Sequence, residues 1–304
     1  MAAITYTTQL LNGILMLTML FQNISRGLAS WKRVKEVLHS QPDLADGSFD
    51  GNTKLHGQVE FRNASFAYPG SKQVILKNIS LTIRPGETLA IMGATGCGKS
   101  SLVNLIPRFY DVTEGVVLVD GVDVREYRQK ALRQKIAVAL QKSELFRATI
   151  RENIAWGNLE AGKEAIRQAA SIAQADSFIS AAPEGYETIV AERGASLSGG
   201  QKQRLSIARA IVKDAEILIF DDSTSALDLK TEADLYDALE KAAPGRTKII
   251  IAQRIASVRR ADRIAVLSGG SIEACGSHEE LMGTCKTYRD IYNSQLGEEE
   301  RYAG

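Results

Sequence analysis

The stretch Gly93–Ser101 constrains this chain most, because it reads Gly-Ala-Thr-Gly-Cys-Gly-Lys-Ser-Ser and matches the phosphate-loop pattern GxxxxGK[ST]. The apolar run Glu87–Met92 precedes it as a predicted strand, and Ser100–Arg108 follows as a predicted helix. Glycines allow backbone angles that side chains forbid, so the loop N–H groups can surround a phosphate at the helix N-terminus. In such a loop Lys99 neutralises the β- and γ-phosphates, and Ser100 ligates Mg²⁺ through oxygen. The predicted phosphate-binding residues are Gly93, Ala94, Thr95, Gly96, Cys97, Gly98, Lys99, Ser100 and Ser101.

A second element favours a phosphate site over a glycine-rich turn that binds nothing. The apolar run Glu216–Phe220 is a predicted buried strand, and Asp221 and Asp222 follow at its carboxyl end. Asp221 is therefore placed to hold Mg²⁺ through water, with Ser100 as the direct ligand. A phosphate loop together with an acid at a strand tip is much more specific than either alone, so we predict a magnesium–nucleotide site.

Strands and helices alternate along most of the chain, which predicts an α/β fold with a mostly parallel sheet and a ligand at the strand carboxyl ends. Ahead of the loop, Gln58–Ala67 and Val74–Ile83 alternate apolar and polar residues and predict an antiparallel hairpin or small sheet. Ile264–Leu267 and Ser271–Cys275 flank Gly269 and Gly270 as a closing hairpin. The other elements that we predict are the strands Val116–Asp120, Ile136–Leu140 and Lys248–Ala252 and the helices Ala161–Asp176 and Gln201–Lys213.

Composition limits the possible partners. The net charge of +1 over 304 residues argues against a nucleic-acid-binding field over the whole surface. The three cysteines, Cys97, Cys275 and Cys285, have no metal or disulfide spacing, which indicates a reducing, cytosolic compartment. Cys97 lies inside the phosphate loop, where we expect either an inert residue or a reactive thiol that nucleotide protects.

The first 25 residues carry no charge, and Leu10–Phe21 is their apolar centre. Arg26, Lys32, Arg33 and Lys35 follow directly. A buried soluble helix is possible, and a signal peptide is disfavoured because no basic segment precedes the apolar run. The basic cluster favours a third interpretation, the cytoplasmic end of a membrane-spanning helix. We therefore expect a membrane helix with its extension over residues 1–40 and a linker over residues 41–57, in a chain that is a piece of a longer polypeptide or begins at an internal methionine.

Several further motifs together resemble one family, the nucleotide-binding domain of ABC transporters, over about residues 59–292. Leu197–Gln201 (LSGGQ) is similar to the family's signature motif, and Ser225–Asp228 (SALD) to its D-loop. Gln141 matches the Q-loop glutamine, and Tyr68 matches the aromatic residue that stacks on adenine. Thr188–Gly194 resembles a segment typical of exporters, although Ala191 replaces its usual glycine.

The resemblance implies a P-loop NTPase (RecA-like) core with an antiparallel β-subdomain and an α-helical signature subdomain at about 142–212, all within a domain of residues 58–296. A tail at 297–304 would follow. Two such domains pair head to tail in this family, so ATP would lie between one chain's phosphate loop and the partner's signature residues, here Ser198, Gly199, Gly200 and Gln201. Gln141 would contact Mg²⁺ and the attacking water, and the loop Lys142–Phe146 would meet the membrane domain.

Two residues depart from the family pattern. Asp222 stands where the family has a glutamate that acts as general base, and Gln253 stands where it has the switch histidine. A carboxylate shortened by one methylene lies ~1.5 Å farther from its target, and glutamine cannot carry a proton. We therefore expect the loop of this chain to bind ATP and hydrolyse it slowly, as in the degenerate half of a heterodimeric exporter. The alternative is a homodimer in which Asp222 is a slower base.

These observations predict an ABC-type ATPase subunit that is coupled to export across the cell membrane, with its nucleotide domain on the cytoplasmic face. Its expected partners are a membrane domain and a second ABC half, and its expected catalytic residues are Asp222, Gln253 and Gln141. A soluble ABC ATPase without transport and an importer ATPase are the alternatives. The apolar N-terminus and the segment Thr188–Gly194 favour export over both. The exported substrate is not encoded in this chain, and multidrug export is the commonest possibility by resemblance.

Overall fold

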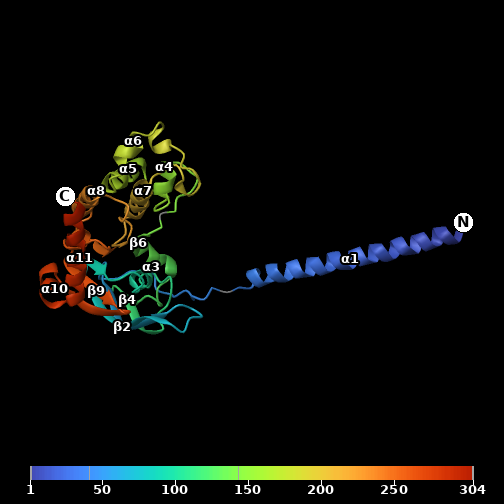
Figure 1. The fold of residues 1–304 in the computed structure, drawn as a ribbon, viewed down its shortest axis with the longest axis horizontal. Helices are drawn as coiled ribbons and strands as arrows, with labels where there is room; N and C mark the ends of the chain where they lie inside the picture. The colour runs from blue at the N-terminus through green and yellow to red at the C-terminus, as the bar shows by residue number, and fades with distance from the viewer. Residues whose placement is uncertain (1, 41, 143, 303–304) are drawn as a thin grey trace. The chain divides into compact units, whose positions relative to one another are not determined.

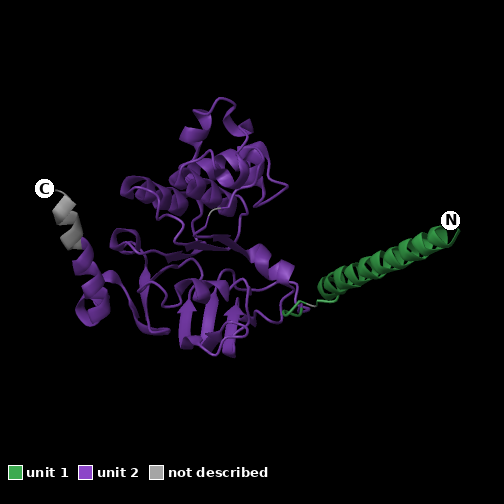
Figure 2. Ribbon diagram, turned by 45° about the vertical axis from the view of Figure 1, so that its right-hand side comes forward, with its two compact units in different colours: residues 1–45 green, residues 46–304 purple. Residues whose placement is uncertain are grey.

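The computed structural model describes residues 2–40, 42–142 and 144–302, and side chains as far as Gln295. Residues 1–45 and 46–304 form two compact units (Figure 2). One residue each of the expected linker (41) and of the loop 142–146 (143), and the last two residues of the expected tail, lie outside the described residues.

The first unit is one helix, α1 (Ala2–Leu38), with 37 residues, none of them buried. Among the described helices, α1 is the one whose length and apolar composition would allow it to cross a membrane. Its length of ~55 Å exceeds the ~30 Å hydrocarbon core of a bilayer. The hydroxyls of Thr7, Thr8 and Thr18 each donate to a backbone carbonyl oxygen four residues earlier, so α1 itself satisfies these polar groups.

The second unit is built around a six-stranded sheet with the order β10-β9-β3-β8-β7-β6. All neighbours are parallel except β10 and β9, which form the predicted closing hairpin. Every residue of β7 and β8 is buried, which explains the apolar runs Ile217–Phe220 and Ile249–Ile251 within them. The strands are β3 (Thr88–Met92), β6 (Ile136–Ala139), β7 (Ile217–Asp221), β8 (Thr247–Ile251), β9 (Arg263–Ser268) and β10 (Ser271–Gly276).

A second, four-stranded antiparallel sheet has the order β2-β1-β4-β5. Its buried side chains share one hydrophobic core with one face of the larger sheet and with α2 (Lys99–Asn104). Apolar residues alternate in β1 and β2 because only one face of this sheet packs on that core. The strands are β1 (Val59–Ala67), β2 (Val74–Ile83), β4 (Glu114–Val119) and β5 (Val122–Asp123).

Short helices between β6 and β7 form a separate layer around α7 (Gly199–Ile211), which contacts both α4 and α5 (Figure 1). They are α4 (Ile150–Ala155), α5 (Lys163–Ile172), α6 (Asp176–Ser180) and the 3₁₀ helices η1 (Gly185–Glu187) and η2 (Glu192–Gly194). The other helices are α3 (Gln129–Lys135), α8 (Leu229–Ala242), α9 (Ile255–Val258), α10 (His278–Thr284) and α11 (Lys286–Tyr302).

The predicted α/β class, with its antiparallel sheet, its helical layer and its N-terminal helix, is confirmed. Several helices differ from the expected bounds. The predicted helix Ala161–Asp176 is shorter, as α5 (Lys163–Ile172), and the predicted helix Gln201–Lys213 begins and ends two residues earlier, as α7. The helix after the phosphate loop ends at Asn104 rather than Arg108, because Pro107 disfavours helical angles at the residue before it. Residues 297–302 of the expected tail continue α11.

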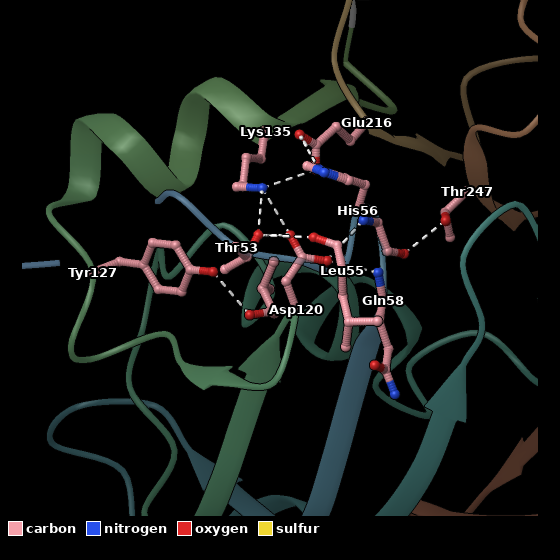
Figure 3. A network of polar contacts seen from close by, with 11 residues as sticks. Thr53, Leu55, His56, Gln58, Asp120, Tyr127, Lys135, Glu216 and Thr247 are labelled. Atoms are coloured by element: carbon pink, nitrogen blue, oxygen red, sulfur yellow. Dashed lines mark hydrogen bonds and ion pairs between the residues drawn. The ribbon is translucent and has the colours of Figure 1, made fainter. Parts of the chain in front are cut away.

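The segment from residue 46 to 58, most of which we expected to be a linker, is hydrogen-bonded to the nucleotide domain. Phe49 N–H donates to the Glu126 oxygen at 2.9 Å, and the Phe49 oxygen accepts from Arg128 N–H at 2.9 Å. Nearby, the buried carboxylate of Asp120 accepts the N–H groups of Gly57 and Gln58 at 2.7 and 2.9 Å (Figure 3).

The ammonium of Lys135 lies 2.8 Å from Asp120 Oδ2 and 2.9 Å from Glu216 Oε2, and it also donates to Thr53 Oγ1. The Asp120 side chain is fully buried and that of Lys135 is 10% exposed. Burial opposes the Lys135 charge, but the hydrogen bonds that Lys135 donates to Asp120 and Glu216 outweigh burial and raise its pKa. We call these residues, Thr53, Asp120, Lys135 and Glu216, the Asp120 network; it joins the chain that follows α1 to three separate parts of the domain.

Candidate functional site

The phosphate loop leaves β3 and enters α2 through three glycines in the left-handed region. Gly93, Gly96 and Gly98 have φ of 151°, 82° and 105°. A Cβ at Gly93 would overlap the carbonyl oxygen of Leu267 on β9, so glycine is required there by close approach as well as by angle. The sequence pattern thus marks a real backbone requirement.

Lys99, the first residue of α2, folds back over the loop. Its ammonium donates to the oxygens of Gly93 and Ala94 at 2.8 and 2.9 Å, and the residue is 9% exposed. These carbonyl groups hold the cation at the loop's centre, where it would meet the phosphates of a nucleotide.

Ser100 and Asp221 come together although 121 residues separate them. Ser100 Oγ donates to Asp221 Oδ1 at 2.9 Å. Burial raises the pKa of the Asp221 carboxyl; the Ser100 bond opposes this, the charge of Asp222 adds to the rise, and that of Lys99 opposes it. Two oxygen donors beside a phosphate loop form a set that suits Mg²⁺.

Asp222 is 8% exposed and has φ of 48°, and one of its oxygens has two amide partners. Gln141 Nε2, two residues after β6, and Gln253 Nε2, two residues after β8, each donate to Asp222 Oδ2 at 3.0 Å. The structure therefore brings the three residues expected to be catalytic onto a single carboxylate oxygen.

Tyr68 lies beside the loop, where its hydroxyl and Ser101 Oγ form a hydrogen bond of 2.9 Å. Its ring contacts Phe66 and Tyr110 edge-on, with centroids 4.9 and 5.2 Å away. Tyr110, which the sequence did not single out, is thus part of the aromatic group that would support an adenine.

The signature residues form the start of α7. Ser198 Oγ accepts the Gln201 N–H at 3.3 Å and the Gln201 Oε1 accepts the Ser198 N–H at 2.9 Å, which is a complete capping box. Two residues on, the buried Gln203 donates to Ser225 Oγ at 3.0 Å and accepts from Ala226 N–H at 2.8 Å. Gln203 therefore connects the D-loop to the signature helix by two hydrogen bonds. No motif or pattern in the sequence indicates this role.

A model of the family described as "ABC transporter" matches residues 76–225, which include the phosphate loop, the signature and both acids. The chain contains an ABC transporter ATP-binding domain.

The similarity between this ABC chain and its relatives extends over nearly the whole chain. A putative multidrug export ATP-binding/permease protein, YgaD, from Bacillus subtilis is 43% identical over 295 residues, which are 97% of this chain and 51% of the relative. An ATP-dependent lipid A-core flippase from Chromohalobacter salexigens is 42% identical over 98% of this chain and 52% of its own length. A solved bacterial Atm1-family ABC exporter with ATP bound superimposes with a TM-score of 0.85 at 37% identity, over 96% of this chain and 51% of that one. The chain therefore spans about half the length of the relatives that it matches.

The position of Cys97 in the ABC domain allows a test of whether its thiol is reactive and protected by nucleotide. Its thiol is half-buried, and Sγ lies 4.0 Å from Lys99 Nζ, so an adduct would crowd the ammonium that faces the phosphates. In a Cys275→Ser background, which removes the exposed thiol, we expect maleimide to label Cys97 and to abolish ATP binding. Saturating Mg·ATP should slow the labelling at least about tenfold by occupying the loop. Mass spectrometry of the labelled peptide measures this, and labelling that is indifferent to ATP would contradict it.

Proposed function

We propose that this chain is the ATP-binding subunit of an ABC exporter, that it holds Mg·ATP on its own phosphate loop, and that it hydrolyses this ATP slowly. The observation that carries the proposal is the contrast between a complete binding set and an altered hydrolytic set around Asp222. Lys99 is hydrogen-bonded to the loop carbonyl of Gly93, and Ser100 is hydrogen-bonded to Asp221.

The residues present fit Mg·ATP. The loop offers backbone N–H groups at the start of α2, Lys99 supplies the positive charge, and Tyr68 supplies a ring for the base. Ser100 and Asp221 would hold the metal, which would neutralise charge on the phosphates when bound. Gln141 would orient a water from the end of β6.

Slow hydrolysis follows from the length and the surroundings of Asp222. Its carboxylate is one methylene shorter than the glutamate expected at this position, and a misplacement of ~1 Å can lower a rate ~10²-fold. Its Oδ2 also accepts a hydrogen bond from each of the side-chain amides of Gln141 and Gln253. Neither amide can take up or release a proton as an imidazole does.

The signature suggests that this chain also serves a partner's site. Ser198 caps the N-terminus of α7, a helix of 13 residues that begins with Gly199 and Gly200. The backbone N–H groups at such a helix end favour the binding of an anion. We propose that a second ABC half with a complete hydrolytic set lies across from this chain. A homodimer with Asp222 as a slower base is the competing arrangement.

Export rather than a soluble or importer ATPase is supported by α1 and by the relatives. The helix has no buried residue and has the length and composition of a membrane span, with its first basic residue at Arg26. Three of the matching relatives are described as a putative multidrug export ATP-binding/permease protein and two ATP-dependent lipid A-core flippases. We propose a multidrug or lipid substrate and a nucleotide domain on the cytoplasmic face of the cell membrane.

The purified chain should bind ATP tightly and turn it over far more slowly than once per second, which binding and phosphate-release assays measure together. Lys99→Ala, as the control, should abolish binding because it removes the charge that faces the phosphates. Turnover of several per second by identical chains would favour the homodimer and contradict slow hydrolysis. Absence of ATP binding would contradict the function itself.

A further inference from the structure

Gln295, on α11, lies against the turn that carries Gln253. Its Nε2 donates to the Gln253 backbone oxygen at 2.6 Å, and its Oε1 accepts the Ile255 N–H at 2.8 Å. These partners are 42 and 40 residues earlier in the sequence. One side chain from the C-terminal helix therefore holds the main chain on both sides of a single turn.

A carboxamide suits this position because it offers one donor arm and one acceptor arm, as the two backbone groups require. Ile255 is the first residue of α9, whose N–H has no partner within the helix. Arg254 precedes this helix and supplies no side-chain cap, so Gln295 provides the missing acceptor from a distant element. Asparagine has the same carboxamide, but it is shorter by one methylene.

The turn matters because its side chains reach the end of the site where hydrolysis takes place. Gln253 Nε2 donates to Asp222 Oδ2, the same oxygen that accepts from Gln141 Nε2. Arg254 donates to the backbone oxygens of Leu227 and Ser225 at 2.8 and 3.2 Å, and so ties the turn to the D-loop. Hydrogen bonds thus link α11 to the backbone of Gln253, and the side chain of Gln253 to Asp222 and through it to Gln141.

We infer that Gln295 is a positioning residue for hydrolysis: it fixes the turn from Gln253 to Ile255 and thereby places the side chain of residue 253 at Asp222. The inference rests on the proposed function, because it presumes that ATP is hydrolysed at this loop. Gln295 binds main-chain atoms, so its effect does not depend on which side chain occupies position 253.

Two variants of the 304-residue chain separate positioning from simple attachment of α11. Gln295→Met keeps the length and removes both arms, whereas Gln295→Glu keeps an acceptor for Ile255 N–H and loses the donor to the Gln253 oxygen. We expect amide exchange at Ile255 to rise about tenfold in Gln295→Met and to stay protected in Gln295→Glu. In both variants kcat should fall about three- to tenfold, while the Kd for ATP stays within about twofold of the parent value.

Gln295→Met and Gln295→Glu should also lower kcat in the Asp222→Glu/Gln253→His background, where we expect faster turnover and therefore a larger measured rate. Tyr288→Phe is the matched control, since it removes the 2.8 Å bond between the Tyr288 hydroxyl and His278 Nδ1 that joins α11 to α10, and leaves the turn untouched. That control should lower thermal stability and leave kcat as in the parent.

The inference is overturned if Gln295→Met matches the parent in exchange at Ile255, or if it behaves like Tyr288→Phe and loses only stability. It is also overturned if kcat falls while the turn stays protected in Gln295→Met. A chain that binds no ATP would instead defeat the proposed function, and the exchange measurement would still report whether Gln295 holds the turn.

Discussion

Asp222→Glu combined with Gln253→His should raise ATP turnover of the assembled transporter at least about tenfold. The longer carboxylate recovers ~1.5 Å of reach toward the γ-phosphate end of the site. The imidazole adds a group that can donate, accept and become charged near neutral pH, in place of an amide that now occupies Asp222 Oδ2. ATP affinity should change little, because Lys99 and Ser100 are untouched.

Phosphate release by the assembled transporter, with each single variant beside the double variant, measures this effect. We expect the double variant to exceed the product of the single effects, since base and histidine act on the same water. Lys99→Ala in the double background is the control and should return turnover to the background level. A double variant no faster than the parent would show that these two positions do not limit hydrolysis.

Lys135→Met should lower the free energy of unfolding by about 3 kcal/mol. The substitution keeps the packing of the stem and removes the ammonium that lies 2.8 Å from the fully buried Asp120 carboxylate. Asp120 keeps its bonds to the N–H groups of Gly57 and Gln58, so the loss falls at the lower end of the range for a broken buried pair.

Denaturant unfolding of parent and variant measures this loss, with Lys130→Met, an exposed lysine on the same helix, as the matched control. The pKa of Lys135 is raised above its ordinary value of 10.5, so its contribution is complete below that pH and disappears as pH rises through the raised value. The stability difference between parent and Lys135→Met should therefore shrink only in strong alkali. Equal losses in both methionine variants would contradict a specific role for the Asp120 network.

The strands and the loop were predictable because their signals are local. Val74–Ile83 was expected with the bounds that β2 has, since alternation over ten residues reports a half-buried strand directly. The apolar run before Asp221 marked β7 to within one residue. The end of the helix after the loop was less predictable: apolar residues continue to Ile106, but the helix ends at Asn104, ahead of Pro107.

The altered hydrolytic set was also visible in the sequence, because Asp222 and Gln253 could be compared with the family pattern position by position. Their geometry was not visible. Gln141 and Gln253 lie 81 and 31 residues from Asp222, and which of its oxygens they share depends on how β6, β7 and β8 stack in the sheet.

The sequence by itself determined the phosphate loop, the acid at the strand tip and the strand–helix order, since backbone angles and burial periodicity are properties of neighbouring residues. Only the tertiary structure decided that residues 46–58 belong with the nucleotide domain, that Lys135 neutralises Asp120, and that Gln295 holds the turn at Gln253. Glutamine, lysine and aspartate are ordinary surface residues, and nothing local distinguishes those that become buried partners. Their roles arise from contacts between distant segments, which exist only once the sheet has assembled.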